Sequence, residues 1–223
     1  MSGETTRAAA LGRIRATGVV PVLRAASPEA ALLIAAALVN GGMDVLEITM
    51  TVPGAADVIA AVVARWGRDV LVGAGTVTTV AQLDAALAAG ARFVVTPAVV
   101  TRVIAASIER DVATIGGALT PTEVLETHRT GADIVKIFPT GAVGGPAYIR
   151  ALKGPFPEIP LMATGGVTLE SVPKYFDAGV DAVGVGGELI SRMAITSGRY
   201  DVIIDTARAF ITAVQAARRT EAP

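Results

Sequence analysis

Short apolar, β-branched runs alternate with longer Ala- and Leu-rich segments, and this alternation is the feature that most restricts the possible folds. Eight such pairs follow one another at a spacing of roughly 20–28 residues, which is typical of a (β/α)8 barrel. The runs are continuously apolar, as expected of parallel strands covered on both faces. We expect strands at 19–23, 45–49, 70–73, 93–96, 113–115, 134–138, 161–163 and 182–185.

Capping residues mark the ends of the intervening segments. Ser27-Pro28-Glu29 and Thr120-Pro121-Thr122-Glu123 carry the residues that begin helices, and Gly90, Gly131 and Gly179 stand where helices end. We expect helices at 28–40, 55–65, 79–89, 102–110, 121–130, 146–152, 169–178 and 201–217. A further segment, 5–17, is expected to form an extra helix that closes the bottom of the barrel.

The predicted fold class is therefore α/β, a (β/α)8 TIM barrel with an extra N-terminal helix, in a single domain over residues 1–223. A doubly wound sheet would use the same alternation of strands and helices. It would need a glycine-rich turn after the first strand, where this chain has Arg24-Ala25-Ala26-Ser27.

The composition argues against several classes of function. The formal net charge is −1 without a basic run, so neither nucleic acid nor a membrane surface is an expected partner. Cysteine is absent and His128 is the single histidine, which leaves little material for metal sites, thiolate nucleophiles or Ser-His-Asp triads. Residues 1–15 lack the apolar core of a secretory signal, and the longest apolar stretch, 30–39, is roughly half a membrane span. We expect a cytoplasmic protein that needs no metal and no cofactor.

Few charged residues lie within the predicted strands, and Glu47 and Lys136 are two of them. Lysine occurs only three times among nineteen Lys and Arg residues, so a lysine in an apolar strand calls for an explanation. By alternation its side chain points into the barrel with Ile134 and Phe138, or into the helix layer. Burial disfavours the ammonium, and the neutral amine can attack a ketone to form an iminium that accepts the electrons of an adjacent C–C bond. Glu47 would move the protons, although a purely structural ion pair is the alternative.

Other strand ends offer groups that bind anions. Arg24 ends the first strand and could hold a carboxylate with its two-pronged guanidinium, unless it forms a salt bridge with Glu47 or Glu29. Glycine-rich turns follow the seventh and eighth strands, where backbone N–H groups of such barrels commonly hold phosphate. These turns are Thr164-Gly165-Gly166 and Gly184-Val185-Gly186-Gly187. Lys153 and Lys174 are expected to be solvated surface lysines.

An ordered set of segments over about residues 18–190 resembles the 2-keto-3-deoxy-6-phosphogluconate (KDPG) / 4-hydroxy-2-oxoglutarate aldolase family. The segments include Val20-Pro21-Val22-Leu23-Arg24, Leu46-Glu47-Ile48-Thr49, Gly73-Ala74-Gly75-Thr76-Val77, Lys136-Ile137-Phe138-Pro139, Gly144-Gly145-Pro146, Lys153-Gly154-Pro155-Phe156 and Thr164-Gly165-Gly166-Val167. Each segment alone is weakly specific, and their order along the chain makes the resemblance specific.

The resemblance implies a role for each matching position. Lys136 falls on the Schiff-base lysine and Glu47 on the general acid/base. The positions that match substrate-binding residues are Arg24, Thr76, Pro97, Phe138, Thr164, Gly165 and Gly166. Gly186 and Gly187 belong to the eighth-strand loop, where the family usually has a phosphate-binding serine and this chain has Gly187 followed by Glu188. The family is independent of metals and is typically homotrimeric.

The expected function is reversible cleavage of a 2-keto-3-deoxy-6-phospho sugar acid to pyruvate and glyceraldehyde 3-phosphate by a class I aldolase. Cleavage of 4-hydroxy-2-oxoglutarate to pyruvate and glyoxylate is a further expected activity. Two alternatives use the same barrel. One is a sugar-phosphate isomerase or epimerase with Glu47 as base and Lys136 as electrostatic stabiliser, and the other is a catalytically silent barrel that serves as an assembly scaffold.

Overall fold

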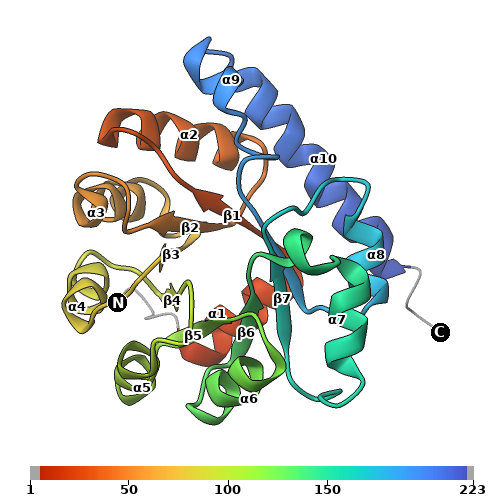
Figure 1. The fold of residues 1–223 in the computed structure, drawn as a ribbon. Helices are drawn as coiled ribbons and strands as arrows, with labels where there is room; N and C mark the ends of the chain where they lie inside the picture. Colours follow the sequence, from red (N-terminus) through yellow and green to blue (C-terminus); the bar gives the residue numbers. More distant parts are fainter. Residues whose placement is uncertain (1–5, 220–223) are drawn as a thin grey trace.

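The computed structural model describes residues 6–219, in which eight parallel strands form a closed barrel surrounded by helices (Figure 1). Neighbours in the chain are neighbours in the barrel, and pairing of the first strand with the eighth closes the ring. The predicted (β/α)8 barrel is therefore confirmed. The strands are β1 (Val19–Leu23), β2 (Val45–Thr49), β3 (Leu71–Gly75), β4 (Phe93–Val95), β5 (Ala113–Ala118), β6 (Ile134–Ile137), β7 (Leu161–Thr164) and β8 (Ala182–Val185).

Helices connect successive strands and cover their outer faces (Figure 1). They are α2 (Pro28–Asn40), α3 (Ala55–Trp66), α4 (Val80–Ala88), α5 (Thr101–Glu109), α6 (Pro121–Arg129), α7 (Pro146–Lys153) and α8 (Val172–Asp177), with α9 (Arg192–Thr196) and α10 (Tyr200–Arg219) after β8. A short 3-10 helix, η1 (Thr140–Val143), lies between β6 and α7. Neither η1 nor α9 was predicted from the sequence.

Several predicted boundaries were wrong for local reasons. The fifth strand continues to Ala118, beyond its predicted end at residue 115, because Gly116 and Gly117 keep pairing with β6. The helix expected from residue 169 begins only at Val172, since Thr168 and Ser171 first bond to each other in a turn. The third strand runs over Leu71–Gly75 rather than 70–73.

The N-terminal helix α1 (Arg7–Thr17) packs against the inside of the barrel at its bottom end. The helix was predicted to begin at residue 5, which lies outside the described residues. Apolar side chains of this helix join the inward-facing side chains of the strands in one cluster, which fills the lower half of the barrel. The cluster consists of Ala10, Leu11, Ile14, Val20, Val45, Leu71, Phe93, Val95, Ala113, Ile115, Ile134, Met162 and Ala182.

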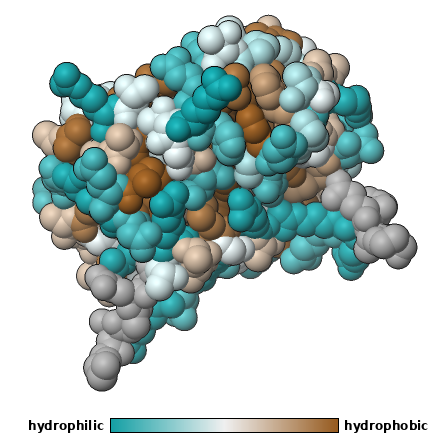
Figure 2. Space-filling model, turned by 90° about the horizontal axis from the view of Figure 1, so that it is seen from below, coloured by the Kyte–Doolittle hydropathy of each residue, from teal (hydrophilic) through white to brown (hydrophobic). Residues whose placement is uncertain are grey.

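A second apolar core lies between the barrel wall and the helices. The long helix α10 packs along α2 and α8 and so covers one side of the barrel (Figure 1). Hydrophilic side chains predominate on the face shown in Figure 2, with hydrophobic ones between them. In residues 6–219, the large hydrophobic side chains that are exposed are Leu33, Val143 and Met193.

Small residues occupy much of the next layer of the barrel interior. Two residues beyond the apolar cluster, alternation turns the same face of each strand inward again. Several of these positions hold glycine, at Gly73, Gly117 and Gly184, whereas Glu47 and Lys136 carry long side chains. A methyl group on Gly73 would overlap the ring of Phe93, so glycine here makes room for an aromatic side chain of the layer below.

We therefore expect Gly73→Ala to destabilise the barrel by about 1–3 kcal/mol, because the added methyl group overpacks a filled interior. Thermal and urea unfolding followed by circular dichroism would measure the change. Gly12→Ala is the matched control: Gly12 is exposed in α1, a Cβ atom there would meet no other atom within 4 Å, and the same substitution should be neutral or stabilising. Equal effects of the two substitutions would contradict this account of packing.

Candidate active site

Lys136 on β6 and Glu47 on β2 meet inside the barrel. Their side chains are 2% and 0% exposed, and the Lys136 Nζ lies 3.7 Å from the Glu47 Oε1. Lys136 points into the barrel, as one of the two predicted orientations required. The separation is within ion-pair distance but beyond a normal hydrogen bond, so the two groups attract without locking each other in place.

Glycine creates the space that Glu47 occupies. A Cβ atom on Gly75, the last residue of β3, would overlap the carboxylate of Glu47. Strand pairing sets Glu47 opposite Gly73 on one side and Val22 on the other. The strand neighbours of this carboxylate are therefore apolar or lack side chains, which strengthens its electrostatic interaction with Lys136.

Four buried side-chain atoms of the described residues have no hydrogen-bond partner, and all four belong to predicted site residues. They are both carboxylate oxygens of Glu47, the Oγ1 of Thr76 and the Oγ1 of Thr164. Unpaired buried polar atoms are rare in folded proteins and call for a specific explanation, such as a role in binding or catalysis. Thr76 also has a φ of 54°, a backbone conformation that costs energy for a β-branched residue.

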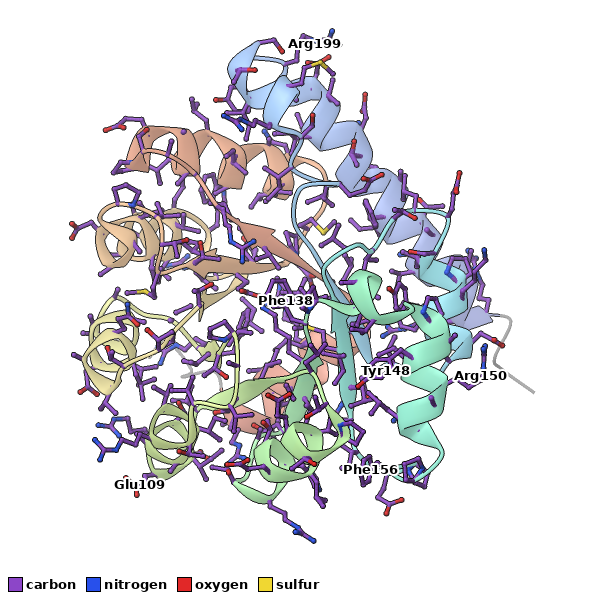
Figure 3. All side chains as sticks on the ribbon, viewed as in Figure 1. Glu109, Phe138, Tyr148, Arg150, Phe156 and Arg199 are labelled. Atoms are coloured by element: carbon purple, nitrogen blue, oxygen red, sulfur yellow. The ribbon has the colours of Figure 1, made fainter. Side chains whose placement is uncertain are left out.

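A cavity of about 260 Å³ opens at the carboxyl ends of β1, β6, β7 and β8. Most of the predicted substrate-binding residues border it. Its lining consists of Val22, Arg24, Phe138, Thr164, Gly165, Gly166, Val167, Thr168, Gly184, Gly186, Gly187 and Glu188. The ring centroid of Phe138 also lies 5.6 Å from the Lys136 Nζ, so this side chain lies between the cavity and the buried pair. Figure 3 shows Phe138 near the middle of the ring of strands.

Arg24 and Glu188 are the charged residues of this lining, and both are exposed. Arg24 forms no hydrogen bond or ion pair with any residue in 6–219, so the salt bridge with Glu47 or Glu29 that we considered is absent from this part of the chain. The carboxylate of Glu29 instead accepts hydrogen bonds from its own backbone and from Ser27, which lower its pKa. The guanidinium of Arg24 is thus available to a ligand in the cavity.

Two predicted binding residues, Thr76 and Pro97, do not border the cavity, and Pro97 lies against the fifth strand. The backbone of Pro97 packs against Gly117, where a Cβ atom would overlap it. Gly117 faces the barrel interior and pairs with Lys136, so the backbone of Pro97 lies on the inner side of β5, next to the strand of the lysine.

The prediction that Lys153 is a solvated surface lysine was wrong. Its ammonium donates hydrogen bonds to the carbonyl oxygens of Ile159 at 2.8 Å and Pro157 at 3.3 Å. Burial lowers the pKa of Lys153, against the opposite effect of the carboxylates of Asp181 and Glu158. Lys153 therefore caps a loop on the outside of the barrel, away from the cavity.

Two further observations concern metals and membranes. Across residues 6–219 we find no group of three or more His, Cys, Asp and Glu side chains arranged to hold a metal ion. In the same part of the chain, no helix combines the length and the apolar character needed to cross a membrane.

The fold and the site define a (β/α)8-barrel enzyme with a buried lysine–carboxylate pair below a cavity at the carboxyl ends of its strands. The family model of KDPG and KHG aldolases matches residues 11–206. The chain belongs to the KDPG and KHG aldolase family, which confirms the resemblance seen in the sequence. It is therefore a lyase of the aldolase class.

Three similar proteins illustrate the relationship. The 2-dehydro-3-deoxy-6-phosphogalactonate aldolase of Escherichia coli is 36% identical over 171 residues, which are 76% of this chain and 83% of the relative. The 2-dehydro-3-deoxy-phosphogluconate aldolase of Treponema pallidum is 36% identical over 87% of this chain and 90% of its own. The KDPG aldolase of Legionella pneumophila, solved with pyruvate captured as a covalent carbinolamine, has a TM-score of 0.82 at 31% identity and covers 92% and 98% of the two chains.

We expect Gly75→Ala to lower kcat for aldol cleavage by about tenfold or more, because the new methyl group must displace the Glu47 carboxylate from its position beside Lys136. Pyruvate release measured under steady-state conditions would show the loss. Gly12→Ala, the exposed helix substitution, should leave kcat unchanged. If Gly75→Ala kept the wild-type kcat, the position of Glu47 would not matter for catalysis.

Proposed function

We propose that the chain is a Schiff-base (class I) aldolase that reversibly cleaves a 2-keto-3-deoxy-6-phospho sugar acid to pyruvate and glyceraldehyde 3-phosphate. Cleavage of 4-hydroxy-2-oxoglutarate to pyruvate and glyoxylate is a second activity under the same proposal. The observation that carries it is the buried pair of Lys136 and Glu47, with 3.7 Å between Nζ and Oε1.

In the proposed reaction, Lys136 first gives a proton to Glu47, and its neutral amine then attacks C2 of the keto acid to give a carbinolamine, which loses water to form an iminium. The C4 hydroxyl then loses its proton as the C3–C4 bond breaks. The bonding electrons move to the iminium, which becomes an enamine, and the aldehyde leaves. Protonation of the enamine at C3 and addition of water release pyruvate and restore the amine. Glu47 lies close enough to Lys136 to exchange protons in these steps, directly or through water.

The remaining predicted residues divide between the two ends of the substrate. Under the proposal Arg24 and the hydroxyl of Thr76 hold the keto-acid end, and Phe138 shields the iminium with its apolar ring. The glycine turns at Gly165, Gly166, Gly186 and Gly187 present backbone N–H groups to the phosphate end. The unpaired hydroxyl of Thr164 borders the same cavity and supports its assignment to substrate binding.

The relatives support both the proposed Schiff-base mechanism and the proposed class of substrate. The Legionella pneumophila enzyme captured pyruvate as a covalent carbinolamine, which is the first adduct expected on the way to a Schiff base. The named relatives include enzymes for the galactonate-type and for the gluconate-type phosphorylated acid. A panel with both C4 epimers therefore belongs in the assay. We further propose a single-domain protomer that acts in the cytoplasm as a homotrimer, which the family resemblance supports.

Incubation with pyruvate and borohydride should add to Lys136 the mass of one pyruvic acid less one oxygen atom, because borohydride reduces the imine to a stable amine. Lys136→Arg should abolish this label and lower kcat by a factor on the order of a thousand or more. Peptide mass spectrometry locates the label. Lys153→Arg, the same change at the half-buried lysine that ends α7, should keep the label. An isomerase that used Glu47 as a base would turn over without any trapped adduct.

Glu188 should weaken the binding of phosphorylated substrates, because its carboxylate borders the cavity and repels a second anion. We expect Glu188→Gln to lower KM for the 6-phosphate substrate by about threefold to tenfold and to leave KM for the unphosphorylated acid nearly unchanged. Steady-state kinetics at low and at high ionic strength would measure both, and the difference should shrink with added salt. An equal change for the two substrates would exclude an electrostatic cause.

A further inference from the structure

Two buried hydroxyl groups outside the predicted site form a chain of hydrogen bonds toward it. Tyr175, on α8, is 1% exposed, and Thr140, at the start of η1, is fully buried. The hydroxyl of Tyr175 donates to the Oγ1 of Thr140 at 3.2 Å. Neither residue is predicted from the sequence to have a role, since a tyrosine in a helix and a threonine in a loop are ordinary there.

The chain ends at the turn after β7. The hydroxyl of Thr140 is shared between the carbonyl oxygens of Thr164 and Gly165, at 3.1 Å to each. The backbone N–H of Gly141 also donates to the Gly165 carbonyl, at 2.8 Å. Two successive carbonyl groups of this turn are thus held from η1, the segment that follows the lysine-bearing strand β6.

These contacts fix the direction of the N–H groups in the turn. A trans peptide unit is planar, and its N–H points opposite to its C=O. Because the carbonyls of Thr164 and Gly165 point toward Thr140, the N–H groups of Gly165 and Gly166 point away from it. Both glycines border the cavity and have φ values of 85° and 81°. Glycines adopt many conformations, so the shape of this turn depends on such external contacts.

We propose that Thr140 and Tyr175 are positioning residues that hold the Thr164–Gly166 turn in the shape that receives the distal end of the substrate. The inference rests on the proposed function, in which this turn donates N–H groups to a phosphate. Tyr175 acts through Thr140: its bond to the Thr140 oxygen fixes the rotation of that hydroxyl, which then donates to the carbonyls. Gly145 lies against the phenol, where a Cβ atom would be 3.3 Å from the Tyr175 hydroxyl.

The proposal predicts a split between binding of the distal group and chemistry at Lys136. Tyr175→Phe keeps the aromatic ring in the core and removes the hydroxyl, and Thr140→Val removes the hydroxyl without changing the shape of the side chain. Each should raise KM for the 6-phosphate substrate by about threefold to tenfold. The exchange of pyruvate methyl protons with deuterated solvent, which needs only Lys136 and Glu47, should stay within about twofold of the wild type.

Two further variants separate this role from general stability. Thr140→Ser keeps the hydroxyl and should restore KM toward the wild-type value. Tyr148→Phe is a control at a different tyrosine, whose partly buried hydroxyl donates to the Leu119 carbonyl at 2.6 Å. This substitution should leave KM unchanged. The double variant Tyr175→Phe/Thr140→Val should raise KM no more than Thr140→Val alone, because both act through one hydroxyl.

Three outcomes would overturn the proposal. If KM stayed at the wild-type value in both Tyr175→Phe and Thr140→Val, the positioning role would be excluded, while pyruvate exchange would still support the aldolase. Pyruvate exchange that falls as much as cleavage would show a general structural role. Absence of pyruvate exchange in the wild type would instead overturn the proposed function, and this inference with it.

Discussion

The arrangement of the barrel interior depends on one interaction, the attraction between the ammonium of Lys136 and the carboxylate of Glu47 across 3.7 Å. Both side chains are withdrawn from water, and an isolated charge in such a place would cost several kcal/mol. Each charge is therefore tolerated only because the other is present. The pair is also not satisfied by hydrogen bonds, since neither carboxylate oxygen has a partner among residues 6–219. A pair that attracts without being locked retains polar atoms that can interact with a third group.

The same barrel provides stability at one end and chemistry at the other. At the bottom, α1 and the large inward-facing side chains fill the interior, so this end is packed like any protein core. In the layers above, glycines at Gly73, Gly75 and Gly184 leave space for the side chains of Phe93, Glu47 and Thr164. The change from large to small residues along the strands leaves room for the buried pair and for the cavity beyond it. The packed bottom of the barrel and the open site above it thus both result from the decrease in side-chain size along the strands.

The sequence predicted the barrel and most of its site because both depend on local patterns. The charges of Glu47 and Lys136 in apolar strands singled out the pair, although strand alternation left two orientations open for Lys136. The strand ends indicated Arg24 and the glycine turns that border the cavity, and the resemblance added Phe138. What it missed depends on three-dimensional contacts. Gly116 and Gly117 extend β5 because β6 pairs with them, the lysine at 153 is held by carbonyls of a loop, and Thr140 reaches a turn that lies 24 residues further along the chain. No spacing or propensity encodes such contacts in a single sequence.

The two ends of the site are built from different kinds of groups, and this difference has a consequence for specificity. Under the proposed function, the reacting end uses buried side chains whose charges balance, so a substitution there disturbs both the fold and the chemistry. The distal end consists mainly of glycine backbone, with Glu188 as its charged side chain, and Glu188 is exposed, as is Arg24 at the keto-acid end. Exposed charges and backbone turns can change with little effect on stability. The carbon–carbon bond chemistry is therefore expected to be the constrained property of this chain. The preference for the distal group is the adjustable one, set by the turn that Thr140 holds and by the carboxylate of Glu188 beside it.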